Sequence, residues 1–152
     1  MINLKIYVDA DACPVKELVV KAARRRKLPV VMICDTAHRI HDGYSTVITV
    51  EKGRDSADLK LANLLTAGDV VVTQDFGVAA LALGKRAGAI NQNGLVFTPD
   101  NIDRLLFERH LGQKVRRGGG KTASSPKRTR TDNQAFERAF DALLDSCMHG
   151  TD

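Results

Sequence analysis

Apolar and polar positions alternate along the first two thirds of the chain in the manner of short strands followed by helices. Compact apolar runs predict strands over Leu4–Val8, Val30–Cys34, Thr46–Val50, Asp69–Thr73 and the short Ala89–Ile90. Apolar residues at helical spacing predict helices from Pro14 to Lys27, over Asp58–Ala67 and Val78–Arg86, and from Thr98 to Leu111. This order favours a three-layer α/β fold with a mostly parallel central sheet.

The pattern stops after Leu111. Residues 112–131 contain Gly118-Gly119-Gly120 and Ser124-Ser125-Pro126 with almost nothing apolar, which predicts a flexible linker. An amphipathic helix follows over residues 132–148, with Phe136, Phe140, Leu143 and Leu144 on its apolar face. We therefore expect a domain over residues 1–111, a linker over 112–131 and a C-terminal helix that docks on the domain or on a second subunit. A homo-oligomer is compatible with this organisation.

Composition indicates an ordinary globular protein. The chain has 152 residues, of which 43% are hydrophobic and 27% charged, and it has no apolar run near the ~20 residues of a membrane span. The N-terminus lacks a signal-peptide pattern, so we expect a cytoplasmic protein without a membrane partner. The cysteines Cys13, Cys34 and Cys147 have no CxxC spacing, which argues against a disulfide framework and a zinc knuckle. Cys34 is expected to be buried, and Cys13 is either packed or a nucleophile.

Acidic residues stand where the apolar runs end. Asp9 and Asp11 follow the first strand and Asp75 follows Asp69–Thr73, while Asp55 and Asp58 lie at the start of a helix. Neighbouring strand ends in a parallel sheet share a crevice, and carboxylates gathered there repel one another unless a cation lies among them. The pattern predicts an Mg²⁺ or Mn²⁺ site built from Asp9, Asp11, Asp58 and Asp75. Asp55 is either a further ligand or, with Ser56, only a helix cap.

Charge is unevenly distributed. Residues 1–110 contain 15 Lys and Arg against 13 Asp and Glu, whereas residues 112–131 contain no acid and seven cations: Lys114, Arg116, Arg117, Lys121, Lys127, Arg128 and Arg130. Such a stretch either binds a polyanion or only solubilises the chain. Lys16 and Arg39 are candidate phosphate contacts, with solvated surface positions as the alternative. Aromatic residues make up only 5% of the chain, which argues against base-specific recognition by stacking.

Three blocks of sequence carry a family resemblance. The run Asp9-Ala10-Asp11-Ala12-Cys13-Pro14, the run Asp55-Ser56-Ala57-Asp58 and the run Gly68–Asp75 resemble the uncharacterised bacterial YaiI/YqxD family, which is grouped with PIN-like nuclease folds. The resemblance implies a PIN-like fold with an Mg²⁺ or Mn²⁺ pocket formed by the four aspartates, and with the Thr73 hydroxyl beside it. The chain departs from PIN nucleases in having Asp58 where they usually have a Glu, and Asn91 and Asn93 where they have a later acid.

These observations favour a metal-dependent phosphodiesterase acting on RNA or another nucleic acid, with RNA preferred over DNA. The alternative is a metal-containing module that binds nucleic acid or protein without chemistry. A third hypothesis is a haloacid-dehalogenase-type phosphatase, because Asp9-Ala10-Asp11 fits the DxD opening of those enzymes. The later sequence fits them poorly, because Asp69 and Asp75 bracket one strand and must lie at its opposite ends.

Overall fold

The structure is a computed structural model that describes residues 4–11, 13–35, 40–51, 56–117 and 127–149. For five residues inside helices it describes the backbone alone, namely Ser56, Gln113, Val115, Arg116 and Arg117. The predicted site residues Asp55 and Arg39 and the basic residue Lys121 lie outside the described residues.

The described residues form five strands and five helices in the predicted order. The strands are β1 (Ile6–Asp9), β2 (Val30–Asp35), β3 (Thr46–Val50), β4 (Val70–Val72) and β5 (Gly88–Ile90). The helices are α1 (Lys16–Arg26), α2 (Ser56–Leu64), α3 (Phe76–Gly84), α4 (Pro99–Arg117) and α5 (Arg130–Met148).

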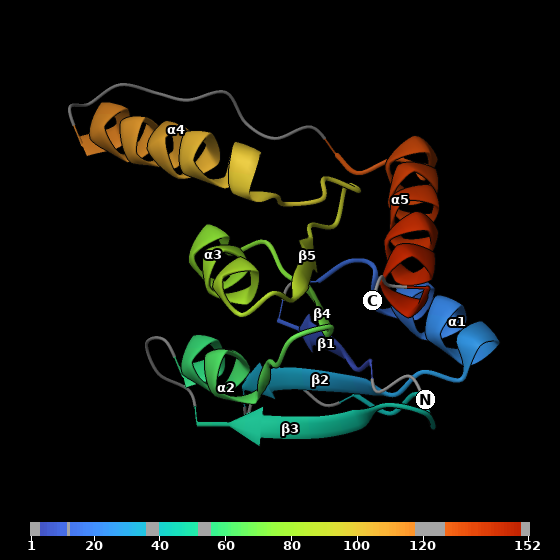
Figure 1. The fold of residues 1–152 in the computed structure, drawn as a ribbon. Helices are drawn as coiled ribbons and strands as arrows, with labels where there is room; N and C mark the ends of the chain where they lie inside the picture. The colour runs from blue at the N-terminus through green and yellow to red at the C-terminus, as the bar shows by residue number, and fades with distance from the viewer. Residues whose placement is uncertain (1–3, 12, 36–39, 52–55, 118–126, 150–152) are drawn as a thin grey trace.

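The strands form one sheet in the order β3-β2-β1-β4-β5, and every described strand pair is parallel. The prediction of a three-layer α/β fold with a mostly parallel sheet is confirmed (Figure 1). The chain builds outward from β1 through β2 to β3, and then crosses back to continue through β4 and β5. The order therefore reverses between β1 and β4, and ligands of open parallel sheets bind at such a reversal, outside the carboxyl ends of the strands.

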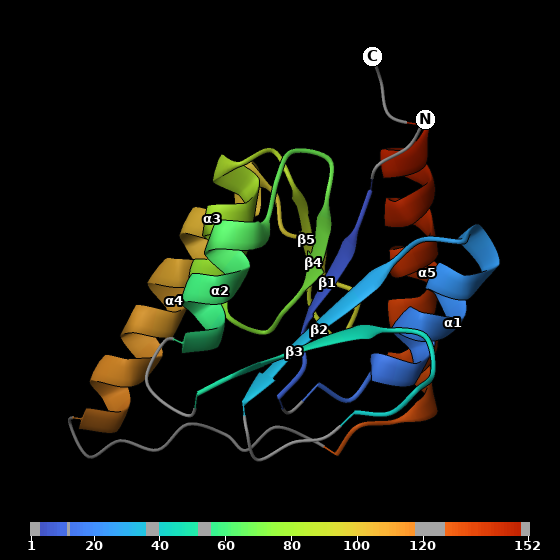
Figure 2. The same ribbon diagram turned by 90° about the horizontal axis from the view of Figure 1, so that it is seen from below.

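Helices cover both faces of the sheet, with α1 and α5 on one side and α2, α3 and α4 on the other (Figure 2). Successive residues of a strand point to opposite faces, so Ile6 and Val8 pack toward α1 and α5 while Tyr7 packs toward the other layer. This double coverage explains why the middle of β4 is wholly apolar, with Val70, Val71 and Val72 all buried.

The C-terminal helix α5 docks on the domain, which is one of the two alternatives predicted from the sequence. Its residues Phe136, Phe140 and Leu144 are fully buried in the core beside α1. Arg26 of α1 adds ion pairs to Asp141 and Asp145, at 3.1 and 3.0 Å. Since α5 completes one face of the sheet, it belongs to the same hydrophobic core as residues 4–90.

Several helix boundaries differ from the prediction. Helix α2 spans Ser56–Leu64 rather than Asp58–Ala67, α3 ends at Gly84 rather than Arg86, and α5 begins at Arg130 rather than at residue 132. Helix α4 continues through Gly112 to Arg117, past the predicted end at Leu111, so the first residues of the predicted linker are helical. Helix α3 begins at Phe76 rather than Val78, because Asp75 caps it. None of the helices in the described part of the chain has the length and apolarity needed to cross a bilayer.

Candidate functional site

Asp9 and Thr73 lie side by side at the reversal point of the sheet. Asp9 is the last residue of β1, Thr73 follows β4, and the register that pairs Val8 with Val72 brings the two to the same level. The Thr73 hydroxyl donates a hydrogen bond to Asp9 Oδ2 at 3.1 Å, and Thr73 is only 2% exposed. Thr73 thus fixes the orientation of Asp9, in agreement with the hydroxyl expected beside the site.

Asp75 is held to Thr73 and to the start of α3. Its backbone N–H donates to Thr73 Oγ1 at 3.0 Å. Its Oδ1 accepts hydrogen bonds from the backbone N–H groups of Gly77 at 2.7 Å and Val78 at 3.1 Å, which makes Asp75 the N-cap of α3. A Cβ atom at Gly77 would lie 3.0 Å from this oxygen, so a glycine suits the position. Asp75 therefore has a structural role as a helix cap, which the sequence analysis did not assign to it.

Asp11 lies on the turn after β1 and contacts the end of β2. Its carboxylate oxygens accept from the backbone N–H of Asp35 at 3.1 and 3.4 Å. Lys16 stabilises the same turn, because its Nζ donates to the carbonyls of Ala10 at 3.2 Å and Cys13 at 3.0 Å. The ammonium group predicted to contact phosphate therefore also orders the backbone that carries Asp11.

Three further carboxylates, from the turn after β1, from α2 and from the start of α3, act electrostatically on Asp9. Burial raises the pKa of Asp9 from 3.8 to about 6, and the hydrogen bond from Thr73 opposes this rise. Three further negative charges add to the rise in the pKa of Asp9, those of Asp58, Asp75 and Asp11. The structure thus places Asp11, Asp58 and Asp75 within electrostatic reach of Asp9, with Asp58 contributed by the first turn of α2.

The donor set fits a hard cation in part. Mg²⁺ prefers carboxylate oxygen and is commonly held by one or two carboxylates together with water and substrate phosphate. Asp9 and its three neighbours offer such donors. Among the residues that the structure describes, however, no three His, Cys, Asp or Glu side chains form a group that could hold a metal ion. The described carboxylates by themselves would therefore leave such an ion short of protein ligands.

Other candidate residues have structural roles. Arg128 was assigned from the sequence to the nucleic-acid-binding tail, yet it is half-buried and donates to Gln92 O, Asn93 Oδ1 and Asn133 Oδ1 at 2.6 to 2.8 Å. It therefore connects α5 to the segment after β5. Lys127 and Arg130 are exposed, while the side chains of Arg116, Arg117 and Ser56 are among those not described.

The remaining candidates are buried groups. Burial raises the pKa of the Cys13 thiol, which disfavours the reactive thiolate form. Cys34 is fully buried, as expected. Asp69 lies at the opposite end of β4 from Asp75, where it accepts from the backbone of Lys5 and Thr66 at 3.1 and 2.9 Å. This placement agrees with the argument against a haloacid-dehalogenase site.

The sequence interpretation missed Asp35. This residue ends β2, and its backbone N–H orients Asp11. The signal was present, because Asp35 follows the apolar run Val30–Cys34 just as Asp9 follows Leu4–Val8.

Comparison with known proteins identifies the chain's relatives. Residues 7–146 match the family described as "Uncharacterized BCR, YaiI/YqxD family". The chain belongs to the YaiI/YqxD family. The match extends to residue 146 and so includes most of α5, in keeping with its place in the core of this YaiI/YqxD protein.

Similar curated proteins extend over nearly the whole chain. A UPF0178 protein of Ruminiclostridium cellulolyticum is 60% identical over 137 residues, which is 90% of each chain. UPF0178 proteins of Alkaliphilus oremlandii and Exiguobacterium sibiricum are 50% and 48% identical, over 93% of this YaiI/YqxD chain and 92% and 96% of theirs. No solved structure matches it.

Proposed function

We propose that this protein is a metal-dependent phosphodiesterase that cleaves RNA or another nucleic acid at the carboxyl ends of β1 and β4. The observation that carries the proposal is the convergence of Asp9, Asp11, Asp58 and Asp75 at the reversal point of a parallel sheet. Repulsion among four carboxylates makes a cation the natural complement of this edge. The resemblance to PIN-like nucleases points to the same chemistry.

The residues of the chain would position the reacting groups. Asp9, oriented by Thr73, and the neighbouring aspartates would hold Mg²⁺ or Mn²⁺. Such an ion, when bound, neutralises phosphate charge and lowers the pKa of water. The cap at Asp75 and the hydrogen bond from Asp35 N–H to Asp11 keep two of the carboxylates in fixed orientations before substrate arrives.

Cleavage of labelled single-stranded RNA and DNA with Mg²⁺ or Mn²⁺ tests the proposal. Asp9→Asn and Asp75→Asn should each reduce cleavage by about 100-fold or more, because each removes a charge from the site. Asn retains the capacity to cap α3, so Asp75→Asn should stay folded. Asp69→Asn is the matched control, since it changes an aspartate at the far end of the same strand and should leave cleavage intact. Wild-type rates in the Asp9 and Asp75 variants would disprove the assigned site.

One observation favours the alternative of a binding module without chemistry. The described residues contain no ready group of three metal-binding side chains. RNA binding that survives in every variant, with no cleavage of any substrate under any divalent metal, would support this second function instead.

A further inference from the structure

A groove of about 700 Å³ runs along α1, outside the acidic cluster. One wall is α1 and the other is the segment at residues 40–42, in the crossover between β2 and β3. Val20 and Ile40 give the groove an apolar floor. We call it the α1 groove. Sites that enclose small molecules have volumes of about 300–1,000 Å³.

Cations outnumber acids along the rim of the α1 groove. Glu17 and Asp42 contribute negative charge, whereas four positive side chains line it: Lys16, Lys21, Arg24 and Arg25. Nine residues of helix separate Lys16 from Arg25, a distance of about 14 Å at the rise of an α-helix. A linear polyanion that lies along α1 therefore meets positive charge over several successive phosphates.

Two of the four rim cations, Lys21 and Arg25, remain available to a ligand. Lys21 and Arg25 face α5, where they pair with Glu137 at 3.7 Å and Asp141 at 3.9 Å, and both are more than half exposed. Exposed pairs of this length contribute little to stability and exchange readily for another anion. Arg24 differs, because it donates to the Asp42 carbonyl and lies over the Tyr44 ring, and so holds the two walls of the groove together.

Lys16 connects the α1 groove with the acidic cluster. It lines the groove, and its Nζ donates to the carbonyls of Ala10 and Cys13 on the turn that carries Asp11. The groove and the acidic cluster are therefore linked by Lys16, the first residue of α1, which orders the turn that carries Asp11. A strand bound along α1 would lead toward this turn.

We propose that the α1 groove binds a single-stranded nucleic acid and leads it to the aspartates at the end of β1. Phosphates contact Lys21 and Arg25, and an unstacked base lies against Val20 and Ile40. A duplex is excluded from this role, because its bases are stacked and cannot reach the apolar floor. The inference rests on the proposed function, since it names the substrate class and the path by which the strand enters.

Fluorescence anisotropy with a labelled single-stranded RNA of about 12 nucleotides tests the proposal in the presence of EDTA, so that no cleavage occurs. The double variant Lys21→Gln/Arg25→Gln should bind at least about fivefold more weakly, because it removes two phosphate contacts. The slope of log K against log salt should fall by about 1.4 in magnitude, since each contact with a single strand contributes about 0.7. An unchanged affinity and slope would overturn the assignment.

Glu137→Gln is the matched control. It breaks the same Lys21–Glu137 pair as Lys21→Gln but leaves the cation in place. A purely structural role for the pair predicts equal loss of RNA binding in both variants, and that result would overturn the proposal. Binding by the α1 groove predicts loss in Lys21→Gln, recovery in Lys21→Arg, and equal or tighter binding in Glu137→Gln. Thermal melting of each variant checks that it is folded.

Two further outcomes separate the groove from the proposed function and from a smaller ligand. RNA binding that depends on Lys21 and Arg25, in a protein that cleaves nothing, supports the groove while contradicting the phosphodiesterase. Uridine 5′-monophosphate should displace the RNA only weakly, because it offers one phosphate. Full displacement by this mononucleotide at an equal phosphate concentration would overturn strand binding and indicate a site for single nucleotides.

Discussion

Asp9 is partly buried and has three negatively charged neighbours. Both conditions disfavour its ionised form and raise its pKa to about 6. A carboxyl group whose pKa is higher in the folded state than in the unfolded state binds its proton more tightly when folded. The folded protein therefore loses stability as pH rises from about 3.8, where the unfolded group ionises, to about 6, where the folded group does so. Below this pH window the ionisation of Asp9 costs the folded protein no stability, and above it the full loss of stability applies.

Replacing Asp9 with Asn should stabilise the protein at neutral pH. The variant has no charge to desolvate, and we expect its free energy of unfolding in EDTA at pH 8 to exceed that of wild type by about 2 kcal/mol. The difference should disappear near pH 3.5, where both side chains are neutral. Urea denaturation at the two pH values measures it. Equal stability of the two proteins at pH 8 would show that Asp9 lies in a less acidic environment than the structure indicates.

The same residues show how far sequence reasoning reaches. Asp9, Asp11, Asp58 and Asp75 could be selected because each adjoins an apolar segment, and parallel topology brings strand ends together. The cap formed by Asp75 could have been foreseen, since an acid directly before an apolar helix is a common N-cap. The role of Arg128 could not, because its partners Gln92 and Asn93 lie far away in sequence and meet it only through the docking of α5.

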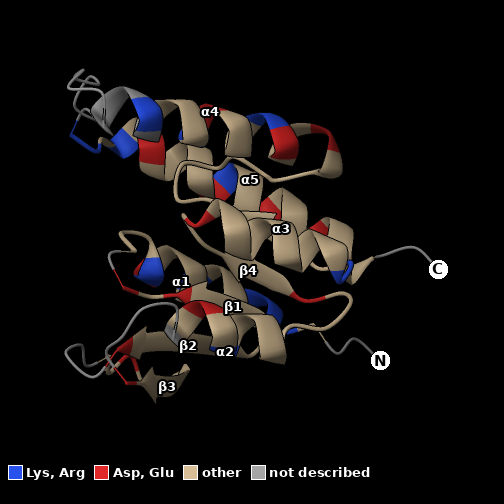
Figure 3. Cartoon of the chain, turned by 90° about the vertical axis from the view of Figure 1, so that its left-hand side faces the viewer, with Lys and Arg blue, Asp and Glu red and all other residues tan. Residues whose placement is uncertain are grey.

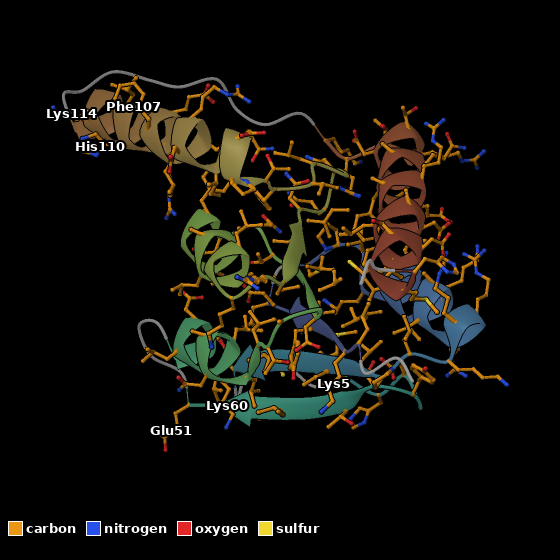
Figure 4. The ribbon with its side chains drawn as sticks, viewed as in Figure 1. Lys5, Glu51, Lys60, Phe107, His110 and Lys114 are labelled. Atoms are coloured by element: carbon orange, nitrogen blue, oxygen red, sulfur yellow. The ribbon has the colours of Figure 1, made fainter. Side chains whose placement is uncertain are left out.

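At the scale of elements, the strands and most helices followed from hydrophobic periodicity, whereas helix ends did not. Leu111 was a reasonable end for α4, because Gly112 disfavours helix and the apolar pattern stops there. The helix nevertheless continues, and its second half stands away from the sheet, as Figure 4 shows for Phe107, His110 and Lys114. Phe107 is 61% exposed and Leu111 45%, so this half gains little from packing.

The exposed half of α4 should therefore open easily. Short helices without tertiary contacts are marginal in water, and a glycine within one costs about 1 kcal/mol relative to alanine. We expect amide protons of residues 107–114 to exchange with solvent much faster than those of α5, whose apolar face is buried. Gly112→Ala should slow exchange in this half of α4 by about fivefold and leave α5 unchanged. Hydrogen-exchange mass spectrometry measures both, and strong protection in wild type would contradict the expectation.

At the scale of the whole molecule, the two helical layers differ in how charged residues hold them in place. Helix α3 contains no Lys, Arg, Asp or Glu and lies between α2 and α4 in the layer seen in Figure 3. On the other face, the C-terminal helix α5 covers β1 and β5. It is held there by contacts of Arg26 and Arg128 and by its buried phenylalanines. Deletion of residues 112–152, a simple way to remove the basic stretch, would therefore also remove part of the core. Charge-neutralising substitutions at Lys127 and Arg130 test the stretch without that loss.

The close approach of α5 to the segment after β5 can be tested with two glycines. Gly94 and Gly68 have φ angles of +88° and +90°, a conformation that costs a residue with a side chain roughly 1–2 kcal/mol. A Cβ at Gly94 would lie 2.7 Å from the carbonyl oxygen of Ala135 in α5, whereas nothing lies within 4 Å of a Cβ at Gly68. Gly68→Ala thus measures the cost of the backbone conformation alone.

We expect Gly94→Ala to destabilise the protein by about 2 kcal/mol more than Gly68→Ala, because it adds displacement of α5 to the same backbone strain. Urea denaturation gives the two free energies of unfolding, and tighter hydrogen-exchange protection of α5 in Gly68→Ala than in Gly94→Ala locates the effect. Equal losses would mean that α5 yields without cost and is only loosely attached. A larger loss at Gly94 would show that the close contact between α5 and the segment after β5 contributes to the stability of the folded protein.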